Sequence, residues 1–546
     1  MDRRGGPRKV LEYRMKREDM LARVRERKAL WDILVIGGGA TGAGVALDGA
    51  SRGYSLLLLE REDFGKGTSG RSTKLIHGGV RYLQQGKLAL VVEALKERDI
   101  LRRNAPHLVH ELPFLIPSYT FLEKPFYGAG LKLYDLLAGK SGFRKSKLLS
   151  RTQALERQPA IRQEDLRGGV LYYDGQFDDA RLLITIVTTA ADHGATVLNH
   201  AGVVELTKNS AGFVNGAIAL DGETGERLCC EARVIVNATG IFSDEVRRLS
   251  EAGAPTMIAP SQGIHLVFDN SFLNGGAAVM VPHTVDGRLM FAIPWHEHTL
   301  IGTTDTPIAA PCYEPRPLEQ EIQFILETAG RYLRKKPRRE DILSSFAGVR
   351  PLLKPSGAAA RATSRLSREH SISIDSSGLL TVAGGKWTTY RRMAEDAVDE
   401  AIKVGRLKPV PCVTKNLRLH GYDPTPAGAL AAYGSDAARI RDLAANEPYL
   451  ARQLDAELPY TGAEVVWAAR NEMARTLDDV LARRLRALPL NARAAMRMAS
   501  ETATLLARET GKDEAWAEEQ VRAFQTLVAQ YALDSLGDTT VAPLGI

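Results

Sequence analysis

The sequence predicts an α/β protein with a Rossmann-like nucleotide-binding domain, an antiparallel-sheet substrate domain inserted into it, and an all-α C-terminal domain. Three observations predict this class. Residues 32–60 have a βαβ pattern with a glycine-rich turn, and residues 258–305 contain several short apolar runs of strand character. From about residue 411 the composition shifts to Ala, Arg, Leu and Glu, with apolar residues at helical spacing. The length of 546 residues suits two to four domains.

The first element reads DILVIGGGATGAGVALDGASRGYSLLLLE and contains three glycines in G-x-G-x-x-G spacing: Gly37, Gly39 and Gly42. The first glycine permits a tight turn, the second lets a pyrophosphate approach the backbone, and the third lets the helix lie close to the sheet. The N-terminus of that helix attracts phosphate. Glu60 ends the second strand, where a carboxylate accepts hydrogen bonds from a ribose hydroxyl. The pattern therefore predicts a site for FAD or NAD.

The remaining elements follow in order along the chain. Residues 63–83 are rich in Gly, Ser and Thr, which is typical of a loop that follows a cofactor. The predicted helices are residues 88–103, 180–193, 319–332, 393–404, 491–510 and 513–533; the predicted strands before the substrate sheet are residues 196–206, 214–219, 227–232 and 233–240. The runs IHLVF, AAVMV, LMFAIPW and LIGTTD predict the substrate sheet.

Composition bounds the class of protein. Apolar residues make up 44% of the chain and charged residues 25%, as in soluble globular proteins. No apolar run approaches the length of a membrane span or a signal peptide, so we expect a cytoplasmic protein. The four cysteines have neither metal-ligand nor redox-pair spacing, which favours reduced thiols and predicts no metal site; they are Cys229, Cys230, Cys312 and Cys412.

The net charge of +7 is concentrated at the N-terminus. Residues 1–30 contain eleven Lys or Arg and five acids. This basic extension is either a solvated helix or disordered leader, or a contact with anionic lipid or a partner. A nucleic-acid site is not expected, because the only aromatic residues in or beside the extension are Tyr13 and Trp31.

Eight motifs together carry a resemblance to a known family: DILVIGGGATGAGVALDGASRG, TSGRSTKLIHGGVRYL, FDDAR, VNATG, IPW, IGTTD, GVRPL and GGKWTTYR. Their set and order resemble the FAD-dependent, quinone-linked glycerol-3-phosphate dehydrogenases over about residues 32–391. The segment PYTGAEVVWAARNEMARTLDDVLARR in the C-terminal part is also similar. The resemblance implies oxidation of sn-glycerol 3-phosphate to dihydroxyacetone phosphate by hydride transfer from C2 to FAD N5, with electrons passed to a membrane quinone.

Charge, composition and the resemblance together predict a division of the chain. Charge marks residues 1–30 as the basic extension, which lies outside the resemblance, and composition marks residues 411–546 as the helical domain. The resemblance implies that residues 31–410 form the oxidoreductase core. Within the core, the FAD-binding segments are about residues 31–110, 175–260 and 345–410, and the substrate-binding segments are about residues 111–174 and 261–344.

A phosphorylated substrate requires cations, and planar guanidinium groups bind phosphate oxygens in pairs. By resemblance the substrate-binding residues are Arg81, Tyr82, His265, Arg350, Arg368, Lys386 and Thr388. Arg368 matches more loosely, because several arginines surround it.

Oxidation of the alcohol also requires a proton acceptor, for which histidine is suited. We expect His265 or His77 in this role. The expected catalytic set is completed by Arg350, Lys386 and Arg81, of which Arg350 or Lys386 would stabilise the developing alkoxide.

The expected cofactor is non-covalent FAD. The predicted FAD-binding residues are Gly37, Gly38, Gly39, Gly42, Glu60, Thr68, Ser69, Ser72, His77, Gly79, Val203, Gly240, Gly385, Lys386 and Thr388. Two alternatives share the fingerprint: a glycerol-3-phosphate oxidase that reduces O₂, and a related amine-oxidising flavoenzyme.

The expected partners are glycerol 3-phosphate, a membrane quinone, an anionic membrane surface and, as an assembly, a homodimer. Because a quinone lies in the bilayer, we expect peripheral attachment to the inner face of the cytoplasmic membrane. Residues 144–147, residues 334–339 and the basic extension are the expected lipid contacts.

Overall fold

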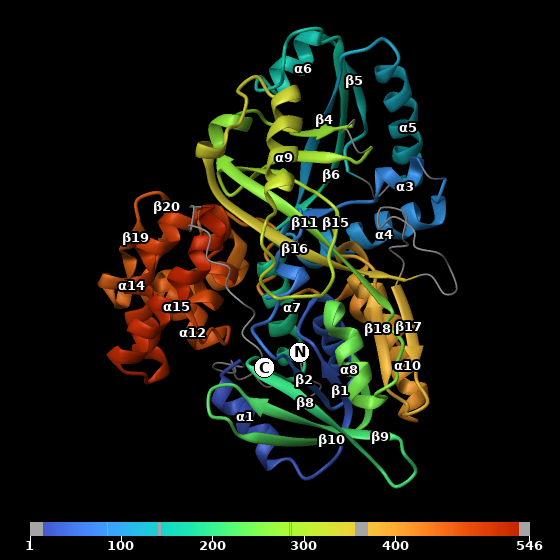
Figure 1. Ribbon diagram of the computed structural model, residues 1–546, viewed down its shortest axis with the longest axis vertical. Helices are drawn as coiled ribbons and strands as arrows, with labels where there is room; N and C mark the ends of the chain where they lie inside the picture. The colour runs from blue at the N-terminus through green and yellow to red at the C-terminus, as the bar shows by residue number, and fades with distance from the viewer. Residues whose placement is uncertain are drawn as a thin grey trace, which may run out of the picture.

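The computed structural model describes residues 15–84, 86–139, 143–282, 284, 287–354 and 370–533. Two large sheets form the body of the molecule, and the C-terminal helices pack against one side of it (Figure 1). The arrangement confirms the predicted α/β class with a helical C-terminal domain.

The first sheet carries the βαβ unit and has the strand order β17-β18-β10-β1-β2-β7, with β8 and β9 extending from β10. Its strands are β1 (Trp31–Ile36), β2 (Leu56–Leu59), β7 (Thr196–Leu198), β8 (Ala201–Lys208), β9 (Val214–Asp221), β10 (Arg227–Asn237), β17 (His370–Ile374) and β18 (Leu380–Gly384). The central strands are parallel, and the parallel-paired parts of these strands are largely apolar and buried, as expected for a sheet covered on both faces. The associated helices are α2 (Ala40–Ser51), α7 (Asp179–Asp192), α8 (Ser243–Ser250) and α10 (Tyr390–Val404).

Strand β10 joins two predicted elements into one. Its first half pairs with β9 as the expected hairpin, and its second half continues as the buried parallel neighbour of β1. The predicted strand over residues 196–206 is instead interrupted at Asn199, whose side-chain amide donates to Asp63 Oδ1. The break separates β7, which belongs to the parallel sheet, from β8, which pairs antiparallel with β9.

Helix α1 (Arg17–Glu26) corrects one expectation about the basic extension. Residues 17–26 are neither solvated on all sides nor disordered, because Met20, Leu21 and Val24 are buried in the core of the first sheet. Arg17 is only 3% exposed and donates to Asp221 Oδ2 at 3.2 Å. Half of the extension is therefore part of the domain; residues 1–14 lie outside the described residues.

The second sheet has the order β15-β11-β14-β13-β12-β4-β6-β3, with β16 paired to β11 and β5 to β6. Its strands are β3 (Leu75–Ile76), β4 (Val109–Ser118), β5 (Lys147–Leu149), β6 (Gly168–Phe177), β11 (Ile258–Asp269), β12 (Ala278–Val281), β13 (Met290–Trp295), β14 (His298–Gly302), β15 (Thr306–Pro307) and β16 (Ile342–Leu353). The sheet is antiparallel except for the parallel pair of β4 and β12. Strand β16 lies here, although most of its residues fall within the predicted FAD-binding segment 345–410.

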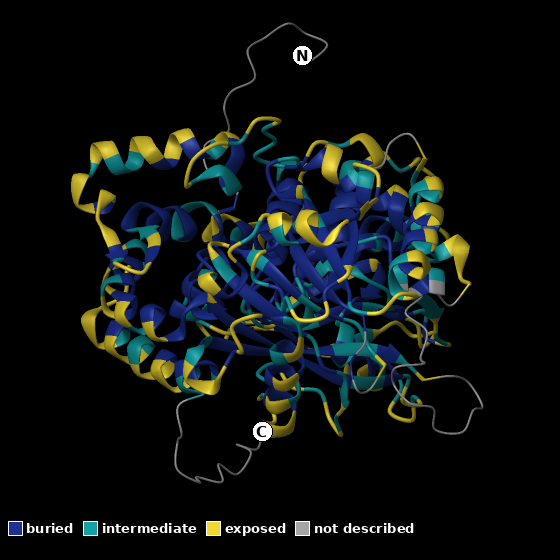
Figure 2. Cartoon of the chain, turned by 90° about the horizontal axis from the view of Figure 1, so that it is seen from above, coloured by how far each residue is buried: buried dark blue, intermediate teal, exposed yellow. Residues whose placement is uncertain are grey.

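Helices flank the second sheet along its length (Figure 1). They are α3 (Val80–Gln84), α4 (Leu88–Asn104), α5 (Glu123–Ala138), α6 (Arg151–Arg157) and α9 (Glu319–Tyr332). The C-terminal domain contains α11 (Ala437–Asn446), α12 (Gly462–Asn471), α13 (Ala487–Leu490), α14 (Ala492–Thr510) and α15 (Glu514–Ala532), with a short hairpin of β19 (Gln453–Asp455) and β20 (Leu458–Thr461). The helices of this domain, like the central strands of the two sheets, are buried on their inner faces (Figure 2).

Among the described residues, no helix is both long and apolar enough to cross a bilayer. The four cysteines, all of which the structure describes, are free thiols.

Candidate functional site

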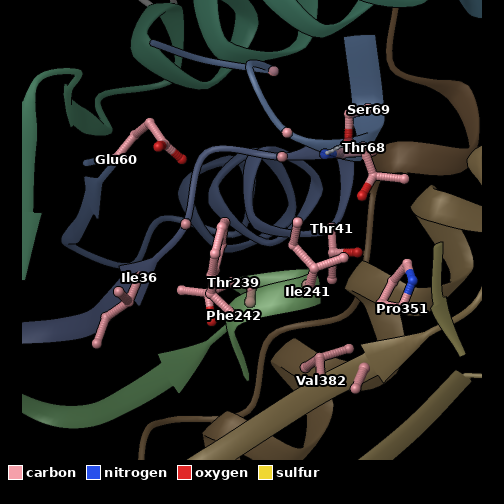
Figure 3. A pocket seen from close by; sticks show the side chains of 18 of the residues that line it. Ile36, Thr41, Glu60, Thr68, Ser69, Thr239, Ile241, Phe242, Pro351 and Val382 are labelled. Atoms are coloured by element: carbon pink, nitrogen blue, oxygen red, sulfur yellow. Dashed lines mark hydrogen bonds between the residues drawn. The ribbon is translucent and has the colours of Figure 1, made fainter. Parts of the chain in front are cut away.

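A first cavity opens at the carboxyl ends of β1, β10 and β18, where ligands bind in parallel α/β sheets (Figure 3). The residues predicted from the sequence that line this cavity are Gly37, Gly39, Glu60, Thr68, Ser69, Val203, Gly240, Gly385 and Lys386. Figure 3 shows Glu60 at one end and Thr68 and Ser69 at the other, with the turn between β1 and α2 between them. The cavity therefore runs along the glycine-rich turn.

The geometry of the turn explains its glycines. Gly37 has φ +105°, a left-handed conformation that L side chains rarely adopt. A β-carbon at Gly42 would lie 1.8 Å from the carbonyl oxygen of Gly37, so the helix approaches the turn only because this position has no side chain. The amide of Ala40, at the start of α2, donates a hydrogen bond to Ser69 Oγ at 2.9 Å. The helix N-terminus thus faces the cavity with its first turn ordered.

Glu60 lies at the end of the first cavity and is 8% exposed. Its carboxylate accepts hydrogen bonds from the amides of Gly38 at 2.5 Å and Glu62 at 2.9 Å. Burial raises the pKa of Glu60, although these two amides favour its ionised form. The carboxylate is held in one orientation and retains acceptor capacity for a ligand hydroxyl.

A second cavity of about 330 Å³ adjoins the first, and Thr68, Lys386 and Trp387 line both. It lies between the second sheet and the turns that precede α3 and α10. Cations line much of its wall: Arg71, Lys87, Arg288, Arg350 and Lys386. The arrangement suits a small anionic ligand placed beside whatever occupies the first cavity.

Arg350 projects from β16 into the second cavity. Its guanidinium donates to the carbonyl oxygens of Thr304 at 2.9 Å and Gln262 at 3.2 Å, and Asp305 Oδ1 lies 3.4 Å away. A β-carbon at Gly263 would lie 2.3 Å from Arg350 Nη2, so this glycine provides the space for the guanidinium. These contacts fix the orientation of the planar group before any ligand binds.

His265 projects from β11 into the same cavity and is 2% exposed. Its Nε2 lies 2.9 Å from Thr73 Oγ1, and its ring stacks on Phe346 with centroids 5.0 Å apart. Burial, together with the charges of Lys74 and Arg350, holds the pKa of His265 well below its usual range. The imidazole is therefore neutral at physiological pH, the form that accepts a proton.

Lys386 and Thr388 follow β18 at the turn into α10. Lys386 Nζ lies 3.7 Å from the centre of the Tyr82 ring, a cation–π contact that brings both residues to the second cavity. Thr388 Oγ1 donates to the carbonyl oxygen of His77 at 3.4 Å. This bond ties the turn before α3 to the turn before α10.

Most predicted site residues line one of the two cavities. Seven of the predicted FAD or substrate residues line the second cavity and not the first: Ser72, His77, Gly79, Tyr82, His265, Arg350 and Thr388. Gly38 and Gly42 shape the turn itself: the Gly38 amide donates to Glu60, and Gly42 leaves room for the carbonyl oxygen of Gly37. Arg368 lies outside the described residues, and nothing is described of the Arg81 side chain. The individual roles of these residues stay predictions.

Sequence reasoning missed several lining residues. In the second cavity these include Thr73, Arg71, Asp305 and Phe291; the first two lie within the motif TSGRSTKLIHGG and Asp305 ends IGTTD, so the motifs contained the signal. In the first cavity Phe242 and Tyr313 pack with ring centroids 4.5 Å apart, and no local pattern indicated them.

One group among the described residues has the spacing of metal ligands: Asp63, His200 and Asp479 lie within 4.8 Å of one another. Asp63 also accepts hydrogen bonds from Arg484 Nη1 at 2.6 Å and from Arg483. Two guanidinium groups at this one carboxylate compensate its charge, so Asp63 has counter-charges without a metal ion.

Comparisons with known proteins agree with this geometry. Residues 32–391 match the FAD dependent oxidoreductase family, and residues 380–517 match the C-terminal domain of alpha-glycerophosphate oxidase. The mitochondrial glycerol-3-phosphate dehydrogenase SDP6 of Arabidopsis thaliana is 42% identical over 88% of this chain and 82% of its own. The chain belongs to the FAD-dependent glycerol-3-phosphate dehydrogenase family.

Two further relatives extend the match. The human mitochondrial glycerol-3-phosphate dehydrogenase is 40% identical over 90% of this chain and 72% of its own. The glycerol-3-phosphate dehydrogenase from Bacillus halodurans, solved in complex with FAD, superposes with a TM-score of 0.78 at 30% identity, covering 96% of this chain and 99% of that one.

FAD is the cofactor, and the first cavity fits it. The glycine turn leaves room for a pyrophosphate at the N-terminus of α2, Glu60 presents a fixed carboxylate for ribose, and the far end joins the second cavity at Thr68 and Trp387.

Proposed function

We propose that the protein oxidises sn-glycerol 3-phosphate to dihydroxyacetone phosphate and passes the electrons to a membrane quinone. The observation that carries this proposal is the second cavity, where a fixed guanidinium, an ammonium and a neutral buried imidazole converge next to the FAD-binding cavity. When bound, FAD supplies the hydride acceptor, through N5.

Arg350 and Lys386 bind the phosphate group of the substrate. A phosphate dianion accepts charge-assisted hydrogen bonds from guanidinium and ammonium groups, each contributing roughly 1.5–3 kcal/mol. Because the carbonyl oxygens of Gln262 and Thr304 already orient the guanidinium of Arg350, little side-chain entropy is lost on binding. The two cations on one cavity wall orient the substrate with its C2 alcohol toward His265.

His265 serves as the general base. Its neutral ring accepts the proton of the C2 alcohol as the C–H bond breaks, a contribution of about 10²–10⁴-fold in rate. Because Nδ1 is buried, Nε2 is the acceptor, and Thr73 Oγ1 at 2.9 Å orients it. The positive charges of Arg350 and Lys386 stabilise the alkoxide that develops.

Anaerobic reduction of the bound flavin tests the chemistry. Purified protein should be yellow, and glycerol 3-phosphate should bleach its flavin absorbance within seconds in the absence of oxygen. Glycerol, which lacks the phosphate, and glycine, an amine substrate, are the matched controls and should leave the absorbance unchanged. Bleaching by glycine and not by glycerol 3-phosphate would instead identify an amine-oxidising enzyme.

The identity of the electron acceptor requires a separate measurement. We infer a quinone acceptor from membership of this family, and a short-chain quinone analogue should reoxidise the bleached protein faster than air-saturated buffer does. Rapid reoxidation by O₂ with stoichiometric peroxide would identify a glycerol-3-phosphate oxidase instead.

We propose that the protein binds an anionic membrane through α5 and the basic segment that leads into β5. The large apolar side chains Phe121, Leu122, Phe126 and Leu136 are 64–79% exposed. Arg144 and Lys145 precede β5, and Lys147 begins it. Ser146, between these lysines, bonds Lys132 and Asp135 of α5, which places the basic segment beside that helix. Apolar residues beside Lys and Arg form the pattern by which peripheral proteins bind anionic bilayers.

Co-sedimentation with phosphatidylserine vesicles tests this surface. The double variant Phe126→Ser, Leu136→Ser should release the protein from vesicles, whereas Leu318→Ser, an exposed apolar residue beside α9, should not. Equal vesicle binding by all three proteins would contradict the assignment.

A further inference from the structure

We propose that Asp179 is a positioning residue for His265, acting through a buried ion cluster that joins residues 70–74 to Arg486 of the C-terminal domain. The inference rests on the proposed role of His265 as the base. It gives a function to the FDDAR motif, whose acids touch neither cavity, and to the C-terminal domain.

Asp179 begins α7 and is fully buried. Its Oδ2 accepts hydrogen bonds from Lys74 Nζ at 2.6 Å and from the amide of Ser72 at 2.8 Å. Its Oδ1 accepts a hydrogen bond from Arg486 Nη2 at 3.0 Å. One carboxylate therefore binds the segment beside the catalytic cavity and the C-terminal domain at the same time.

Residues 70–74 need this support because their conformation is costly. Lys74 has φ +61°, a left-handed conformation that strains the backbone of a non-glycine residue. Its ammonium is buried, donates to the carbonyl oxygen of Gly70 at 3.1 Å, and depends on Asp179 for its counter-charge. Removing one partner of such a pair leaves the other buried and uncompensated.

The segment presents Thr73 to the catalytic cavity. Thr73 immediately precedes Lys74 and contacts His265 Nε2 through its hydroxyl. Lys74 Nζ also lies 4.9 Å from the centre of the Phe346 ring, on which His265 stacks. Asp179 thus controls two of the contacts that orient the imidazole, one through the backbone turn and one through the ring.

The C-terminal domain completes the cluster. Arg486 donates a second hydrogen bond from Nη2 to Gly70 O at 3.0 Å, and its Nε lies 3.4 Å from Asp178 Oδ1. Without this guanidinium, Asp179 would retain Lys74 as its cationic partner, and Asp178 would retain its contact with His296 Nε2 at 2.9 Å. The domain therefore contributes to the geometry of the base, although none of its described residues lines the second cavity.

A double-mutant cycle tests the coupling. The single variants Thr73→Val and Asp179→Asn keep the shape of each side chain, and each should slow anaerobic flavin reduction at saturating glycerol 3-phosphate on the order of 10- to 100-fold. If Asp179 acts through the Thr73–His265 contact, the double variant should be no slower than the slower single variant. Thr73→Ser should restore the wild-type rate because it restores the hydroxyl.

A spectroscopic readout separates positioning from loss of stability. In protein labelled with ¹⁵N-histidine, the His265 ring signals, assigned from the spectrum of His265→Gln, should shift in both Thr73→Val and Asp179→Asn. The matched control is Glu472→Gln, which removes the charge of a different buried acid, one that lies in the C-terminal domain and is paired with Arg181 of α7. That variant should lower Tm while the His265 signals and the reduction rate stay unchanged.

Three results would overturn the proposal: multiplicative rate losses in the double variant, a wild-type rate in Asp179→Asn, or unshifted His265 signals. If Asp179→Asn does not retain flavin, Arg486→Gln replaces it in the cycle with the same expected outcomes. Failure of wild-type protein to be reduced by glycerol 3-phosphate would refute the proposed function instead, a result distinct from any of these.

Discussion

Gly302 lies directly opposite His265 in the pair of β11 and β14, and a β-carbon at Gly302 would stand 2.3 Å from His265 Cδ2. The imidazole occupies the space that the neighbouring strand leaves by having no side chain there. Gly263 makes the same provision for Arg350. These two glycines of the second sheet therefore leave the space in which the side chains of His265 and Arg350 lie in one cavity.

We expect Gly302→Ala to displace His265, because real β-carbons are not found so close to other atoms and the imidazole is enclosed by Phe346 and Thr73. A shift of about 1 Å at the reacting group costs on the order of 10²-fold in rate. The rate of anaerobic flavin reduction measures the effect, with Gly276→Ala as control, since a β-carbon there meets nothing within 4 Å. Equal rates for the two variants would refute the steric argument.

Arg350→Ala should raise KM for glycerol 3-phosphate at least about tenfold, because a charge-assisted hydrogen bond to phosphate is worth roughly 1.5–3 kcal/mol. Arg350→Lys should recover only part of the loss, since an ammonium cannot form the paired contact. Arg339→Ala removes a surface arginine paired with Glu319 and should leave KM unchanged. Unchanged kinetics in Arg350→Ala would remove this residue from the phosphate site.

The rate of flavin reduction at saturating substrate should not fall between pH 8 and pH 6 through protonation of the base. Burial and the charges of Lys74 and Arg350 hold the pKa of His265 well below 6.5, so the ring stays neutral over this range. Stopped-flow measurements across the range give the profile. A decline with a midpoint near 6.5 that disappears in His265→Gln would show an ordinary histidine and contradict the electrostatic description.

His420 should make thermal stability decrease with rising pH. Burial alone would lower its pKa, but hydrogen bonds to Asp192 and Asp436, both at 2.7 Å, outweigh burial and raise the pKa to about 10. The stabilisation is complete below the unfolded pKa of about 6.5 and is lost as the pH rises to about 10. The Tm difference between wild-type protein and His420→Gln should therefore be largest near pH 6 and vanish toward pH 10. A difference that grows with pH would reverse the sign of this argument.

Local patterns predicted the elements that local physics governs. The glycine turn, Glu60 and the buried strands of the βαβ unit were readable because a tight turn, a close helix and a buried strand each restrict residue type at fixed spacing. The boundaries of α14 and α15 were equally close to prediction, since both have strong apolar periodicity and side-chain caps at Asn491 and Asp513.

Long-range pairing was not readable in this way. The burial of α1 depends on a partner for Arg17 at Asp221, more than two hundred residues away, and the hydrophilic composition of the helix concealed its one buried face. The same holds for Thr73, which resembled an ordinary loop residue until β11 placed His265 beside it.

The sequence by itself determined the nucleotide-binding fold, the family and the glycine-rich motifs that contribute to the two cavities, because these depend on residue type at short spacing. The tertiary structure decided which of them meet: Thr68, Lys386 and Trp387 join the cavities, and Asp179 links the C-terminal domain to the turn beside His265. The physical reason is that hydrogen bonds and ion pairs between distant segments depend on strand register and domain packing, which no local pattern encodes.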